Sequence, residues 1–270
     1  MLDDFLIRSV LAGILMILVA APMGCLMVWQ RLAFLADTLG HAAVLGVALG
    51  LVMSLNSVVS VLLVILIVMV IMQLSRNHSQ RQVGALSESL LAIVSYTGLS
   101  AGILILGVSG AGNISLEAIL FGDLLATSAQ DLLFIMMTVL VLLVLLWFNW
   151  DSFVAVTVSP EIAQAEGISV QKNQMIMYLM IALLVAVMMK IMGVLLIGAM
   201  LVIPVSAARV FSRSPEQMVL LSLVFGLVSL FSGMFFSWQL DLQTGPAIVV
   251  VATLWLLLAV LSQKLNKTLT

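Results

Sequence analysis

The chain has 270 residues, of which 64% are hydrophobic and only 8% are charged. Soluble domains carry about 25% charged residues, so this composition excludes an ordinary soluble protein and predicts an integral membrane protein. The net charge of -2 comes without a basic patch, which excludes nucleic acid as a partner.

Long uninterrupted apolar runs, rather than the alternation typical of membrane β-barrels, predict an all-α, polytopic transmembrane bundle. A run of about 20 apolar residues spans a bilayer. Nine segments reach or approach this length: 5–28, 33–53, 57–74, 86–107, 131–148, 174–190, 192–207, 217–237 and 245–262. The runs 174–190 and 192–207 are either two short helices or one bent helix, so we expect eight or nine crossings.

The segments between these runs are too short to bury the core of a soluble domain. Residues 1–270 are therefore predicted to form a single transmembrane domain, and any energy-supplying domain must come from another chain. The one cysteine, Cys25, lies in an apolar run and is interpreted as a small buried residue.

Asp37 and His41 are the most informative polar residues, because they lie four positions apart in the apolar run 33–53. Positions i and i+4 share one face of a helix, and ionisable groups at membrane depth indicate function. A carboxylate and an imidazole suit a transition metal, but a closed structural zinc site needs four ligands. We therefore predict a transient station on a metal path. The alternative is a structural role, in which the two side chains pair or cap a helix.

The stretch 108–130 is moderately apolar and carries two more carboxylates, Glu117 and Asp123, which are further candidates for the path. We expect this stretch to form a re-entrant or interfacial helix rather than a full crossing. The competing interpretations are that Glu117 is a solvated loop residue and that Asp123 caps the structure following a turn.

Two polar connections are predicted to dock a cytoplasmic partner. The first choice is the segment 207–216, which carries Arg209, Arg213, Ser214, Pro215 and Glu216. Ser214 is expected to cap a helix that begins at Pro215. The second is 159–167, where Ser159 is expected to cap a short helix that begins at Pro160, has Glu161 in its first turn and ends at Gly167. The alternative for either segment is a simple connection between helices.

Pro204 lies in an apolar run, where proline removes a helical hydrogen bond, and it is predicted to act as a hinge. The alternative is that a helix ends there. An enzyme is not expected: Gly107-Val-Ser109-Gly110 matches the Gly-x-Ser-Gly of intramembrane serine proteases, but no histidine follows His78 to serve as its base. The 18 methionines are scattered, which favours packing over a copper path.

Several ordered segments resemble the permease subunits of metal-uptake ATP-binding-cassette transporters, the zinc/manganese/iron family. The resemblance covers essentially the whole chain and is greatest for the zinc permeases of Gram-negative bacteria. The segments are 28–42 (VWQRLAFLADTLGHA), 120–126 (LFGDLLA), 159–163 (SPEIA), 193–204 (GVLLIGAMLVIP), 213–218 (RSPEQM) and 244–247 (TGPA).

This resemblance implies a multi-pass permease of the inner (plasma) membrane with eight transmembrane helices, in which Asp37 and His41 line the metal path. It implies no permanently bound cofactor, with Zn²⁺ as the transported ion. The expected partners are a second copy of the chain, a cytoplasmic ATPase dimer, an extracytoplasmic zinc-binding protein and membrane lipid. ATP hydrolysis would then occur on the ATPase subunit. Manganese or iron is the alternative cargo, and a stand-alone secondary transporter or channel is the alternative of a different class.

Overall fold

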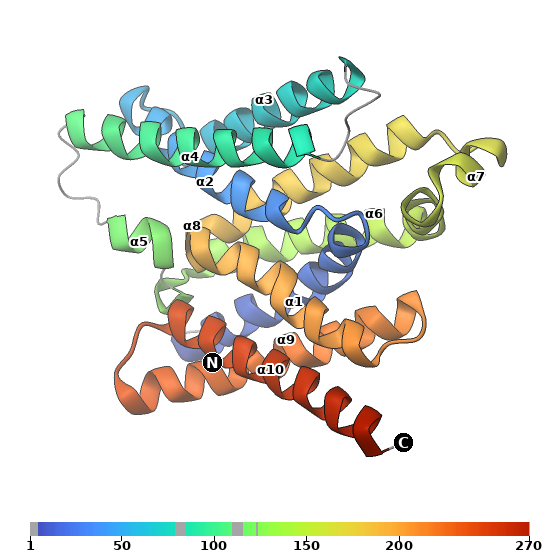
Figure 1. Ribbon diagram of the computed structural model, residues 1–270. Coiled ribbons are helices and arrows are strands. Elements are labelled where there is room, and N and C mark those ends of the chain that lie inside the picture. The colour runs from blue at the N-terminus through green and yellow to red at the C-terminus, as the bar shows by residue number, and fades with distance from the viewer. Residues whose placement is uncertain (1–4, 79–84, 110–115, 123, 270) are drawn as a thin grey trace. The chain divides into compact units, whose positions relative to one another are not determined.

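The computed structural model describes residues 5–78, 85–109, 116–122 and 124–269. These residues form helices and no strand, as the composition predicts (Figure 1). In chain order the elements are α1 (Phe5–Trp29), α2 (Ala33–Val52), α3 (Ser57–His78), α4 (Ala85–Val108), α5 (Leu116–Phe121), the 3-10 turn η1 (Leu124–Ala126), α6 (Ala129–Val158), α7 (Pro160–Ala165), α8 (Val170–Phe211), α9 (Pro215–Leu240) and α10 (Thr244–Leu269).

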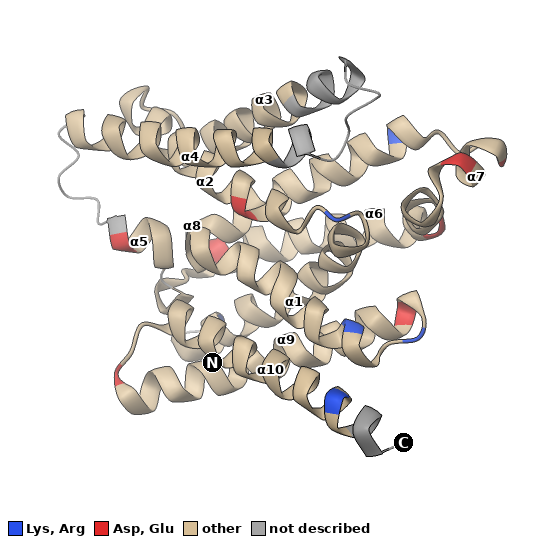
Figure 2. Ribbon diagram, viewed as in Figure 1, with Lys and Arg blue, Asp and Glu red and all other residues tan. Residues whose placement is uncertain are grey.

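Eight helical segments of the described chain are long and apolar enough to cross a membrane, the lower of the two predicted numbers. Six of them lie in α1, α2, α4, α6, α9 and α10, and α8 supplies the two segments Val170–Met189 and Ile191–Phe211. The remaining predicted run falls in α3, whose apolar part, Ser57–Ile71, is shorter. Among the described residues, the charged ones are sparse and lie mostly toward helix ends (Figure 2), as expected for a multi-pass membrane protein.

The break in α8 lies at Gly193, where φ is 71° and ψ is 165°. This backbone conformation is essentially restricted to glycine. Gly122, which follows α5 and has φ 67°, lies directly against it: a Cβ atom on either glycine would collide with the backbone around the other. Pro204 lies inside the helix that follows the break, so the described irregularity of α8 is at Gly193 and the hinge role of Pro204 stays a prediction.

The described chain divides into two compact units that are interleaved in the sequence. Unit 1 comprises 1–33, 123–175 and 199–270, and unit 2 comprises 34–122 and 176–198. In unit 1, α1 packs against α6 and α9, and α9 packs against α10. The last turns of α1 bury Cys25 against Val205, Ala208 and Met218, in agreement with its interpretation as a small core residue.

Glycines allow the helices of unit 1 to approach closely. A Cβ atom on Gly233 of α9 would lie 2.5 Å from the Cα atom of Ile248 in α10, and one on Gly226 would lie 2.8 Å from Ile17 of α1. Lipid gives helices no hydrophobic reason to associate, so this kind of close packing supplies much of their attraction.

Candidate functional site in unit 2

Helix α2 is the centre of unit 2, because α3, α4 and the part of α8 that follows its break all pack against it. A Cβ atom on Gly46 would lie 2.6 Å from the Cα atom of Val61 in α3, and one on Gly40 would lie 3.1 Å from the Cγ1 atom of Val194 in α8. Two glycine-dependent contacts and two polar contacts join α2 to α4. The helix that carries Asp37 and His41 is therefore held on several sides.

The contact between α2 and α4 follows one face of each helix. A Cβ atom on Gly98 would lie 3.0 Å from the Cα atom of Ala42, and one on Gly102 would lie 2.8 Å from the nitrogen of Leu45. One turn earlier, the Thr38 hydroxyl lies 3.3 Å from the carbonyl oxygen of Leu91. Residue numbers rise together along both helices, so α2 and α4 run parallel at this contact.

His41 faces α4 and is half-buried, and its Nδ1 atom lies 2.6 Å from the Oγ atom of Ser95. Ser95 itself has no exposed surface. The described hydrogen bond of the His41 ring therefore joins it to another helix and not to Asp37. It differs from the Asp37–His41 pair that the structural alternative requires. The Nε2 atom is the ring nitrogen left to bind a cation.

Asp37 is also half-buried and lies one turn before His41 on the same face of α2. Its Oδ1 atom occupies the space that a Cβ atom at position 198 of α8 would need, so a side chain there would force the carboxylate to move. The carboxylate and the imidazole therefore lie where α2 meets both α4 and α8 within unit 2.

The chemistry of the pair is that of a partial metal site. One carboxylate oxygen and one imidazole nitrogen are ligands for zinc and for neighbouring transition metals. Within the described residues no third His, Cys, Asp or Glu joins them. Two strong ligands hold a divalent ion more weakly than a closed four-ligand site, which suits an ion that must be released.

The other predicted path residues are not brought to this pair in the described structure. Glu117 lies in the first turn of α5 and is exposed, and Asp123 lies outside the described residues. The six residues of α5 are too few to cross a bilayer, in agreement with the prediction of a short helix here. α5 nevertheless reaches α8 through Gly122, which lies against Gly193 next to the part of α8 that packs on α2.

The two predicted docking segments have different structures. α7 is a separate short helix: Ser159 caps it by accepting a hydrogen bond from the nitrogen of Ile162, Pro160 is its first residue, and Gly167 follows with φ 84°. This confirms the predicted helix. Its Ala163 is buried, whereas Ile162 is 61% exposed.

The segment 207–216 consists mainly of two helix ends. α8 continues through Arg209 to Phe211, and Ser214 caps α9 by accepting a hydrogen bond from Gln217 at 3.2 Å. Pro215 is the first residue of α9, Glu216 lies in its first turn, and the backbone nitrogen of Arg213 donates to the Gln217 side chain at 2.8 Å. Only three residues connect α8 to α9, and the charged side chains of the segment are exposed.

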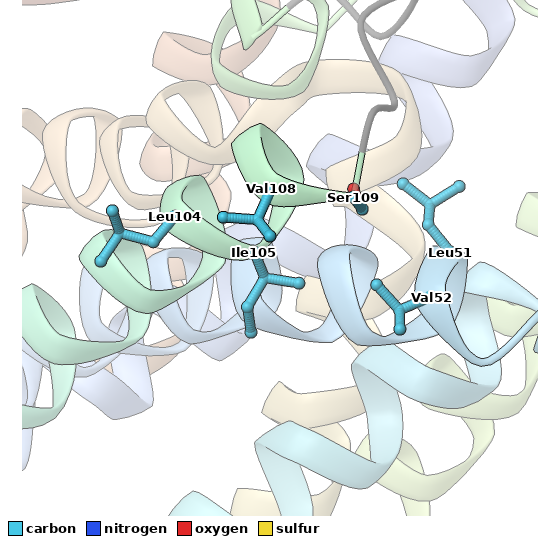
Figure 3. A pocket seen from close by; sticks show the side chains of 6 residues that line it. All are labelled: Leu51, Val52, Leu104, Ile105, Val108 and Ser109. Atoms are coloured by element: carbon cyan, nitrogen blue, oxygen red, sulfur yellow. The ribbon is translucent and has the colours of Figure 1, made fainter.

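An open apolar pocket of about 700 Å³ is lined by residues from the ends of α2 and α4 (Figure 3). Its lining is aliphatic apart from one hydroxyl, and it consists of Leu51, Val52, Leu104, Ile105, Val108 and Ser109. Leu51 is ten positions after His41, or about 15 Å along a helix at 1.5 Å per residue. The pocket is thus separate from the metal-ligand candidates and offers no charged ligand.

Sequence reasoning missed Ser95, Gly198 and the paired glycines Gly122 and Gly193. A usable signal existed for the close helix contacts, because both glycine pairs have the Gly-x-x-x-Gly spacing of tightly packed membrane helices. Gly46 and Gly50 of α2 face α3, and Gly98 and Gly102 of α4 face α2. Ser95 carried no such signal, because α4 contains other serines and only the register of α2 against α4 selects this one.

The comparisons with known proteins agree over nearly the full length of the chain. Residues 2–263 match the ABC 3 transport family. The high-affinity zinc uptake system membrane protein ZnuB of Haemophilus influenzae is 34% identical over 261 residues, which cover 97% of this chain and 98% of that protein. The manganese transport system membrane protein MntC of Halalkalibacterium halodurans is 27% identical over 254 residues, covering 93% and 84% of the two chains.

A solved structure has the same fold. The chain is similar to PsaBC from Streptococcus pneumoniae in complex with Fab, with a TM-score of 0.84 and 25% sequence identity over 94% of this chain and 90% of that one. The fold of this chain has therefore already been observed in a solved structure.

Proposed function

Because the chain belongs to the ABC 3 transport family, we propose that it is the membrane permease of an importer that takes up zinc. The observation that carries the proposal is that Asp37 and His41 lie on one face of a membrane helix. Both are half-buried, and each contacts a different neighbouring helix. A mixed oxygen and nitrogen ligand pair suits zinc, and the 34% identity to a zinc permease supports the same cargo.

Manganese is the second candidate cargo, since a manganese permease is 27% identical to this chain. Manganese prefers oxygen ligands to imidazole. The imidazole of His41 therefore favours zinc, whereas water and backbone oxygens completing the shell would favour manganese.

Moving a divalent ion through hydrocarbon is energetically costly. A layer of about 30 Å needs polar groups along the way, and Asp37 and His41 supply one such station. Asp37 contributes the negative charge that offsets part of the charge of the ion, and His41 contributes a neutral nitrogen ligand. An inside-negative potential favours entry by ~2.3 kcal/mol per charge per 100 mV. ATP hydrolysis on a partner subunit would then drive release from a tight-binding donor protein and make uptake directional.

The experiment that tests the site is zinc-dependent growth of a strain that lacks other zinc uptake routes. Asp37→Ala and His41→Ala are each expected to abolish growth at low zinc, because each removes one of the two strong ligands. Immunoblots of membranes must show both variants at the wild-type level. Normal growth with normally assembled variant protein would remove the assignment of the site.

The partner subunits are part of the same proposal: two copies of this permease, a cytoplasmic ATPase dimer and an extracytoplasmic zinc-binding protein. For the ATPase contact, the structure shifts our preference from the segment 207–216 to α7. α7 is a distinct short helix with an exposed Ile162, whereas 207–216 is a close connection between two long helices.

Cysteine crosslinking compares the two contacts directly, in a Cys25→Ser background that leaves one thiol per permease. We expect Ile162→Cys to crosslink to the ATPase and Arg213→Cys not to do so. The reverse pattern would restore 207–216 as the docking segment.

A further inference from the structure

We propose that Ser95 is a positioning residue for metal transport, which holds the His41 ring so that its Nε2 atom faces the passing cation. The inference rests on the proposed role of His41 as a metal ligand. It begins from the distance of 2.6 Å between Nδ1 of His41 and Oγ of Ser95, a full hydrogen bond between two helices. Ser95 has no exposed surface, so the hydroxyl side of this bond is closed to solvent.

The position of the Ser95 hydroxyl is fixed by the packing around it. The contact of Thr38 with Leu91 lies one turn before it on α4, and the close approach of Gly98 to Ala42 lies one turn after it. Neither helix can slide along the other without breaking these contacts. The imidazole is thus oriented by a rigid neighbour and not by a mobile side chain.

The hydrogen bond sets which ring nitrogen carries the proton. A neutral imidazole has one N–H, and a cation binds the nitrogen that lacks it. When a cation binds Nε2, the proton lies on Nδ1 and Ser95 Oγ accepts it in a hydrogen bond. When the site is empty, the same hydroxyl can rotate and donate to Nδ1 while Nε2 carries the proton. The ring keeps one proton throughout, so exchange between the two states changes no charge.

The choice of a hydroxyl also limits how tightly the ion is held. Histidine ligands in permanent metal sites often donate to a carboxylate, which raises the basicity of the ring. Ser95 is neutral, so it orients the ring without adding a second negative charge beside Asp37. This combination orders His41 for capture and still permits release.

The test uses the permease with its ATPase and its zinc-binding protein in liposomes, with zinc as the probe and zinc uptake as the readout. We expect Ser95→Ala to raise the KM for zinc about tenfold, the lower end of the effect of removing such a partner, with kcat changed less than about twofold. Ser95→Thr keeps the hydroxyl and should restore most of the affinity. The matched control is Ser229→Ala, since Ser229 is equally buried but bonds to the carbonyl oxygen of Phe225 in its own helix.

A spectroscopic readout separates positioning from a merely structural role. The chain has two histidines, so NMR of the reconstituted complex in which only a His78→Gln permease carries ¹⁵N-histidine reports His41 alone. With zinc added, we expect the proton on Nδ1 in the otherwise wild-type chain. This measurement needs no change at Ser95, so a proton on Nε2 would overturn the proposal even where Ser95→Ala assembles poorly.

Two results would overturn the inference: a KM for Ser95→Ala equal to that of Ser229→Ala, or a zinc-loaded His41 with its proton on Nε2. The His41→Ala variant distinguishes failure of this inference from failure of the proposed function. If His41→Ala abolishes uptake while Ser95→Ala does not change it, only the positioning role is wrong. If His41→Ala transports normally, the metal site itself is wrong.

Discussion

Asp37 has room for its carboxylate because residue 198 of the facing helix is glycine. The carboxylate, the ring of His41 and the hydroxyl of Ser95 thereby lie at one junction of three helices in unit 2. The sequence identified the first two of these residues, because ionisable groups in an apolar run are rare enough to be noticed. It did not identify Gly198 or Ser95, because their importance depends on which residues of α8 and α4 face α2.

Gly198→Ala tests this arrangement at the scale of a residue. The added methyl group would overlap Asp37 Oδ1, so the carboxylate must turn away or α2 and α8 must separate. Overpacking of this kind costs about 1–3 kcal/mol. We expect a raised KM for zinc in proteoliposomes, with the variant still present in the membrane.

The control for this variant is Gly107→Ala, since a Cβ atom on Gly107 meets nothing within 4 Å. It should transport as the wild type does and gain slightly in helix stability. If Gly198→Ala and Gly107→Ala have the same uptake kinetics, Asp37 does not depend on the space at residue 198.

At the scale of elements, apolar runs of sufficient length predicted the helices well, and the serine-proline pairs predicted where α7 and α9 begin. The break in α8 lies where the runs 174–190 and 192–207 meet, at which the sequence allowed two short helices or one bent helix. Gly193 was not singled out, because only its conformation and its contact with Gly122 show that a side chain is excluded there. The hinge role of Pro204 stays a prediction, since membrane helices tolerate proline when neighbouring groups satisfy the freed carbonyl.

Gly193→Ala is therefore expected to damage the protein. Alanine at φ 71° and ψ 165° is strained by about 1–3 kcal/mol, and its Cβ atom would also collide with the backbone at Gly122. We predict lower thermal stability of the detergent-purified protein and loss of zinc uptake. Pro204→Ala serves as the comparison: a larger loss of stability from Pro204→Ala would show that the bend depends on proline.

At the scale of the whole molecule, the chain is a multi-pass permease of the ABC 3 family that is similar in fold to PsaBC. The composition was sufficient to predict a membrane protein, and the order of the motifs was sufficient to predict the family. Neither was sufficient to decide which metal ion is transported, because ion selectivity depends on the complete set of ligands around Asp37 and His41.

The central claim is that zinc moves through a station formed by Asp37 and His41. The most direct measurement is ATPase activity of the reconstituted importer with its binding protein, titrated separately with zinc, manganese and ferrous iron. We predict that zinc stimulates hydrolysis at the lowest concentration and that His41→Ala abolishes this stimulation while leaving the basal rate. Stimulation by manganese but not zinc, or full zinc stimulation of His41→Ala, would contradict the account.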